Sequence, residues 1–114
     1  MPRPRRDARL SYPRLVPSEH EVIEALRQVE DPELGMDIVE LGLFYDAAIE
    51  GENVKITFSL TSMGCPVGPM IQEEIERVVR EIPGVGEVES ELTFDPPWTP
   101  ERMSEDAKFI LGFG

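Results

Sequence analysis

Apolar residues recur along the chain with two different periods, and each change of period marks an expected element. After Ser18 the apolar spacing is three and four, which predicts a helix with one buried stripe: Val22, Ala25, Leu26 and Val29. Ser18 and Glu21 fit a capping box, in which each side chain accepts a backbone N–H at the helix start. Pro32 ends this helix, because proline disfavours helical conformation at the residue before it.

Two segments of period two follow. Residues 42–50 place alternate side chains on one face (Leu43, Tyr45, Ala47 and Ile49), and Gly51 lies in the connection to the next segment. There, four apolar residues (Val54, Ile56, Phe58 and Leu60) alternate with four polar ones (Lys55, Thr57, Ser59 and Thr61). This pattern predicts an antiparallel hairpin with one apolar face, which helices must cover.

The second half of the chain predicts a helix, a strand and a helix. The second helix is expected to begin with Pro69 at its first position and to end before Pro83-Gly84. Its apolar stripe is Ile71, Ile75, Val78, Val79 and Ile82. Residues 85–94 predict a third strand, with Val88, Leu92 and Phe94 inward and Glu87, Glu89 and Glu91 outward. A last helix is expected with Thr99 as its cap, running to about Leu111.

The order α-β-β-α-β-α therefore predicts an α+β fold. We expect a two-layer sandwich, with a small mixed three-stranded sheet covered by helices and a right-handed crossover between the second and third strands. The chain has 114 residues, enough for one core. We divide it into a flexible basic leader, residues 1–16, and one domain, residues 17–114.

Charge is distributed unevenly. The first 14 residues carry five arginines and one aspartate, a balance of +4, while the remainder has 6 basic and 22 acidic residues. A domain with this acidic balance repels a phosphate backbone, so nucleic-acid binding is not expected. The charge serves either to keep the protein in solution or to bind a partner with a basic surface. No apolar run approaches the ~20 residues that cross a bilayer, and no signal-peptide pattern is present. A single cysteine forms no disulfide within the chain, so cytoplasm is the expected location.

The one cysteine, Cys65, falls between the second strand and the second helix. A helix N-terminus stabilises a thiolate, although inert buried cysteines occupy such positions equally often. Thr61 and Ser62 would place hydroxyls within reach of whatever the sulfur holds. The chain lacks a second cysteine for dithiol chemistry, and its one histidine, His20, belongs to a polar first turn rather than to a catalytic pair. A lone thiolate can still ligate iron or a cluster incompletely, with the missing ligands supplied by a second copy or a partner.

Four carboxylates lie within ten residues: Asp31, Glu33, Asp37 and Glu40. On this stretch alone, turn formation and capping explain them better than a polar site rim does.

Taken in order, five motifs resemble the metal–sulfur cluster biosynthesis domain of SufT-like and PaaD-like proteins. They are Asp31-Pro32-Glu33-Leu34, residues 37–45, Thr61-Ser62-Met63-Gly64-Cys65-Pro66, Pro83-Gly84-Val85 and Pro96-Pro97-Trp98. The resemblance covers residues 17–112 and implies the small α+β domain of iron–sulfur scaffold proteins. It also implies a site with Cys65 as the metal ligand, bordered by Asp31, Glu33, Asp37, Glu40, Thr61 and Ser62, and with Trp98 packing beside it. PaaD-like members carry further cysteines near the C-terminus, and this chain has none there.

These observations predict a non-enzymatic factor for assembly or delivery of iron–sulfur clusters. Iron or a cluster would be held transiently, the partners would be assembly machinery and apo-protein clients, and the chain would form a homodimer. One alternative is an acidic adaptor, or a component of a phenylacetate-type oxygenase maturation system, that binds no metal. A thiol enzyme ranks last, because no base accompanies the cysteine.

Overall fold

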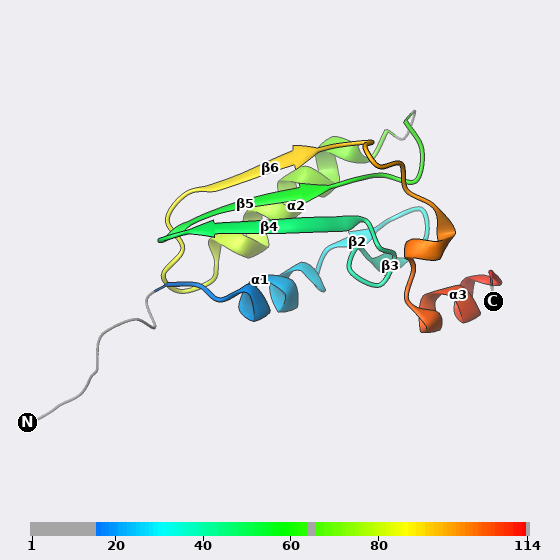
Figure 1. The fold of residues 1–114 in the computed structure, drawn as a ribbon, viewed down its shortest axis with the longest axis horizontal. Coiled ribbons are helices and arrows are strands. Elements are labelled where there is room, and N and C mark those ends of the chain that lie inside the picture. The colour runs from blue at the N-terminus through cyan, green and yellow to red at the C-terminus, as the bar shows by residue number, and fades with distance from the viewer. Residues whose placement is uncertain (1–15, 64–65, 114) are drawn as a thin grey trace, which may run out of the picture.

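The computed structural model describes residues 16–63 and 66–113 (Figure 1). The expected leader lies outside the described residues except for Val16. The described helices are α1 (Glu19–Leu26), α2 (Gly68–Arg80) and α3 (Glu105–Leu111), with a 3-10 helix, η2 (Pro100–Arg102). The strands are β2 (Glu30–Asp31), β3 (Met36–Asp37), β4 (Phe44–Glu50), β5 (Asn53–Phe58) and β6 (Val88–Leu92). None of these helices is long and apolar enough to cross a membrane.

The main sheet has the order β4-β5-β6, with β4 antiparallel and β6 parallel to β5. Helix α2 connects β5 to β6, as Figure 1 shows. The apolar stripes of α1 and α2 share one core with the inward residues of β5, among them Ile56 and Phe58. The predicted α+β sandwich with a small mixed sheet is therefore confirmed.

Both long helices follow the predicted patterns closely. Ser18 and Glu21 form the expected capping box at α1, and the whole predicted stripe of that helix is buried. Helix α2 begins at Gly68, one residue before the predicted start, so Pro69 takes its second position. This shift costs nothing, because none of the first N–H groups of a helix has an intrahelical acceptor.

Two inward or outward assignments in the strands were wrong. A bulge between Phe44 and Asp46 puts Phe44 against the core, and Tyr45 is not part of that core. The extra residue of a bulge reverses the alternation on one side of it. Ser59, predicted to point outward, is fully buried where the chain leaves β5, and its N–H donates to the carbonyl of Leu43. Leu92 does point inward, since it pairs with buried Phe58 and lies beside Gly68 of α2, although it is 38% exposed at the end of β6.

The last predicted helix is two elements. Helix η2 ends at Arg102, Met103 is extended and buried, and α3 then begins after Ser104. Ser104 caps α3 by accepting the N–H of Ala107, whereas Thr99 makes no such hydrogen bond at η2. Thr99 and Pro100 do begin a helical element, as predicted, but it is η2, and α3 begins five residues later.

Candidate functional site

The segment that carries the four clustered carboxylates, residues 30–43, is called the carboxylate loop below. It contains a small hairpin that the sequence did not predict, in which Glu30 pairs with Asp37 and Asp31 pairs with Met36. The turn of this hairpin has Gly35 at φ +73°, and the carbonyl of Asp31 accepts the N–H of Leu34 and of Gly35. The loop is therefore held by backbone hydrogen bonds and not only by its side chains.

Asp31 is the unusual member of the loop, because it is only 1% exposed. Its Oδ1 accepts the N–H of Glu33 at 2.8 Å, which is a turn contact. Its Oδ2 is buried and has no hydrogen-bond partner among the described residues. A buried carboxylate oxygen left without a partner costs free energy, so this atom is available to a cation or to a hydrogen-bond donor from outside the described part.

Asp37 and Glu40 have partners that explain them structurally. Asp37 Oδ1 accepts the N–H groups of Val39 and Glu40, both at 2.9 Å. The Glu40 carboxylate accepts from the Ser104 hydroxyl and from Arg27 Nη1, the latter at 2.9 Å. The hydrogen bond from Ser104, followed by that from Arg27, holds the pKa of Glu40 below its ordinary value.

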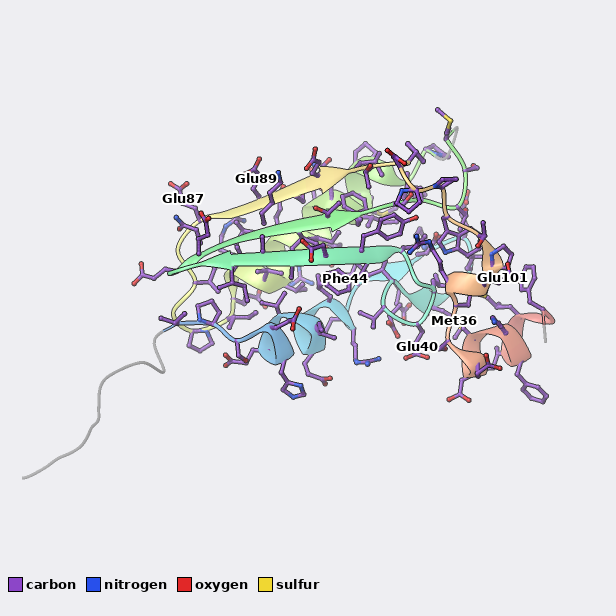
Figure 2. All side chains as sticks on the ribbon, in the orientation of Figure 1. Met36, Glu40, Phe44, Glu87, Glu89 and Glu101 are labelled. Atoms are coloured by element: carbon purple, nitrogen blue, oxygen red, sulfur yellow. The ribbon has the colours of Figure 1, made fainter. Side chains whose placement is uncertain are left out.

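Residues 96–104, called the C-terminal clamp below, lie across the carboxylate loop. The indole Nε1 of Trp98 donates to the carbonyl of Leu41 at 2.7 Å, and Ser104 N donates to the carbonyl of Glu40 at 2.8 Å. Figure 2 shows Met36, Glu40 and Glu101 at the end of the molecule where the two segments meet. The predicted packing role of Trp98 is borne out, since its ring packs on the core beside the loop.

Tyr45, which the bulge in β4 turns away from the core, contacts the C-terminal clamp. Its hydroxyl donates to the carbonyl of Pro96 at 2.8 Å, and the Arg102 guanidinium lies 4.3 Å from the centre of its ring. Sequence reasoning missed these partners and also Arg27 and Ser104. The one residue in the sequence that could have indicated this contact was Gly42. Its φ of +75° and its lack of a side chain let the clamp approach the loop closely.

The hydroxyl residues lie on the segment that leaves β5, with Thr61 half-buried and Ser62 exposed. This segment is tied to the carboxylate loop through the hydrogen bond from Ser59 to Leu43. Within the described ranges, no hydrogen bond joins Thr61 or Ser62 to Asp31, Asp37 or Glu40. Cys65 lies outside the described residues, so its predicted role as a ligand stays a prediction.

The ligand inventory is sparse. Within residues 16–63 and 66–113, no group of three or more His, Cys, Asp or Glu side chains could hold a metal ion. This part of the chain offers one buried carboxylate oxygen without a partner, on Asp31, whereas Asp37 is engaged in a turn and Glu40 binds Arg27 and Ser104. The described residues can therefore contribute one ligand but not a complete coordination shell.

Comparison with known proteins places the chain among factors concerned with iron–sulfur clusters. Residues 19–90 match the family described as iron–sulfur cluster assembly protein. The chain is 46% identical over 92 residues to the Fe-S protein maturation auxiliary factor YitW of Bacillus subtilis, covering 80% of this chain and 90% of that protein. It is 47% identical over 85 residues to the Fe-S protein maturation auxiliary factor SufT of Staphylococcus aureus, covering 74% and 97% of the two chains.

A solved structure agrees with the fold. The crystal structure of a domain of unknown function, DUF59, from Bacillus anthracis matches with a TM-score of 0.78 and 44% identity, over 84% of this chain and 92% of that one.

Proposed function

The chain belongs to the iron–sulfur cluster assembly protein family, and on that premise we propose that it assists the assembly of iron–sulfur clusters or their delivery to other proteins. The observation that carries the proposal is its similarity to two maturation auxiliary factors over most of each chain. The cluster, or iron on its way to a cluster, is then cargo and not a resident cofactor.

In the proposed mechanism, Cys65 is the cargo ligand and acts as a thiolate. Asp31 is the most suitable second contributor, since its Oδ2 is buried and has no partner among the described residues. It would bind the cation directly. Thr61 and Ser62 would donate hydrogen bonds to cargo held by the sulfur.

The other carboxylates have supporting roles in this proposal. Asp37 sets the turn of the carboxylate loop, and Glu40 fixes the loop to α1 and to the C-terminal clamp. Glu33 is exposed and would border the site toward a partner. The absence of a complete ligand set among the described residues supports handover, because cargo held by few ligands is released to a client that supplies more.

We extend the proposal to partners and setting. The chain would act without catalysing a reaction, in the cytoplasm, as a homodimer in contact with assembly machinery and apo-protein clients. A second copy would supply a second Cys65 and so bring the ligand number nearer to that of a cluster.

Anaerobic reconstitution with iron and sulfide tests the proposal. We expect the wild-type chain to bind iron, Cys65→Ala to lose at least tenfold in affinity, and Met63→Ala to behave as wild type. Met63 is a matched control because it belongs to the same loop and is 79% exposed. Uptake should rise with pH as the thiol ionises. Equal binding by wild type and Cys65→Ala, or no binding by either, would contradict direct ligation.

The acidic surface favours one second candidate, an adaptor that binds assembly proteins through this surface and holds no metal. This adaptor would keep full activity in a client-maturation assay when Cys65 is replaced by Ala. The cargo mechanism predicts that this variant is inactive although it is folded, so the two candidates give opposite results.

A further inference from the structure

The face of the main sheet that points away from α1 and α2 has no covering element among the described residues. Cross-strand pairing places its side chains in rows. Asp46, Thr57 and Glu91 form one row, and Ala48, Lys55 and Glu89 form the next. Glu50 pairs with Asn53, whose side chain accepts the N–H of Glu87. This open face, defined by these residues, therefore has five carboxylates and one ammonium.

The open face is also hollowed. A groove of about 340 Å³ runs between the ends of the three strands and is lined in part by Glu50, Lys55, Glu87 and Glu89. Figure 2 shows Glu87, just before β6, and Glu89, on β6, at this end of the sheet.

The one ammonium of the open face is already engaged. Lys55 Nζ lies 3.0 Å from Glu91 Oε1, and the hydrogen bond to Glu91 and the charges of Glu91 and Glu89 raise the pKa of Lys55. Glu50, Glu87 and Glu89 form no ion pair within the described part of the chain. A basic occupant of the groove would relieve their mutual repulsion.

The chain itself contains a segment of matching charge and length. Residues 1–15 hold five arginines and one aspartate, a balance of +4, and they join the described part at Val16. Figure 1 shows this junction at the same end of the long axis as the β4–β5 turn and the start of β6. An extended chain spans ~3.3 Å per residue, so 15 residues reach about 50 Å, whereas seven-residue β4 spans only about 23 Å.

We propose that the arginine-rich N-terminal segment of this chain occupies the open face of its own sheet. Guanidinium groups of Arg3, Arg5, Arg6 and Arg9 would pair with Glu50, Glu87 and Glu89, for which a guanidinium offers a two-pronged hydrogen-bonding geometry. Each exposed pair is weak on its own. Tethering compensates for this, because a short connection gives an effective concentration in the millimolar range. Three prolines in the segment also lessen the entropy lost on ordering.

Paramagnetic relaxation in the full chain tests this contact. A nitroxide is attached to Ser11→Cys in a Cys65→Ser background, and amide signals are recorded in ~10 mM salt and in ~1 M salt, where the Debye length falls from about 30 Å to about 3 Å. We expect the amides of Lys55 and Glu89 to lose more than half of their intensity in low salt and to regain it in high salt. The amide of Ile110, in α3 at the other end of the molecule, should not change.

Matched variants isolate the charges. The triple variant Glu50→Gln, Glu87→Gln and Glu89→Gln should abolish the broadening, and so should replacement of Arg3, Arg5, Arg6 and Arg9 by Gln. The control, Glu73→Gln, Glu101→Gln and Asp106→Asn, removes three exposed charges elsewhere and should keep the broadening.

Two results would overturn the proposal at once: no broadening in low salt, or equal broadening in the Glu50/Glu87/Glu89 variant and in the control variant. A third comes from mixing chains that carry the nitroxide with isotope-labelled chains that do not, where broadening as strong as within one chain would contradict the proposal. The last would mean that the segment binds another molecule. None of these results depends on cluster binding, so the proposed function is tested separately.

Discussion

Replacing Gly42 by Ala should damage the contact between the carboxylate loop and the C-terminal clamp. Gly42 has φ +75°, and a Cβ at this position would lie 2.2 Å from the carbonyl oxygen of Arg102. The nearest atoms belong to the backbone of Arg102, which cannot rotate away as the tip of a flexible side chain can, so the whole clamp has to move. Gly35 offers a matched control, because its φ of +73° is nearly the same and nothing lies within 4 Å of its Cβ position.

The expected magnitudes separate conformational strain from the clash. A left-handed alanine costs ~1–2 kcal/mol, offset by about 0.4–1 kcal/mol from the stiffer unfolded chain, so Gly35→Ala should lose about 1 kcal/mol. Gly42→Ala adds the loss of two hydrogen bonds, from Trp98 to Leu41 and from Ser104 to Glu40, at about 1 kcal/mol each. Part of the burial of Met103 is lost as well, so we expect a total of about 3–4 kcal/mol.

Urea unfolding followed by circular dichroism gives the free energies of both variants. Trp98 is the only tryptophan, so its fluorescence reports separately on the clamp. Its emission should shift to longer wavelength in folded Gly42→Ala and not in Gly35→Ala. If the two variants lose the same free energy within about 0.5 kcal/mol and emit alike, the close approach to Arg102 does not control the clamp.

Three further predictions concern single side chains. Asp31→Asn should leave the free energy of unfolding unchanged or raise it by about 1 kcal/mol, because it removes a buried charge that lacks a full set of partners. The same change should lower iron loading several-fold in reconstitution, whereas Glu30→Gln, at the exposed neighbouring residue, should affect neither quantity. Glu40→Gln should destabilise the chain above pH ~5, and the difference from wild type should vanish in acid. The pKa of Glu40 is lower in the folded chain, so its contribution to stability is present above the unfolded-state pKa of 4.5 and is lost as pH falls through the folded-state pKa. Urea titrations between pH 2 and pH 7 measure this difference, and a difference that does not change with pH would refute the reasoning. Trp98→Phe should cost about 1–3 kcal/mol by leaving the Leu41 carbonyl without its donor, and an unchanged unfolding midpoint would contradict this.

Elements with a regular apolar period could be predicted from the sequence. The stripes of α1 and α2 and the alternation from Val54 to Phe58 each identify a face that packs on the core. The predictions failed where a single bulge residue decides which way a side chain faces, as at Tyr45, or where a single cap decides where a helix begins, as at Ser104. Tyr45 beside the bulge contacts Pro96 and Arg102, and Ser104 binds Glu40 besides capping α3; such long-range contacts leave no periodic trace.

The candidate site was predictable by residue type but not by role. The sequence placed Asp31, Asp37 and Glu40 in one loop, and turn formation explains Asp37 as expected from that stretch alone. What could not be foreseen is that Asp31 would be buried with one oxygen lacking a partner, while Glu40 would bind Arg27 and Ser104. Burial depends on how the hairpin of β2 and β3 packs, and that packing depends on the whole fold.

The hydrogen bonds from Trp98 and Ser104 also bear on the time course of synthesis. A growing chain makes the loop some sixty residues before it makes the donors that hold it, since Leu41 waits for Trp98 and Glu40 waits for Ser104. Helices α1 and α2 and the sheet can pack before those donors emerge, but Leu41 and Glu40 gain their hydrogen bonds only once residues 98–104 have been made. A nascent molecule would thus pack most of its core first and fasten the carboxylate loop only after the segment with Trp98 and Ser104 has been synthesised.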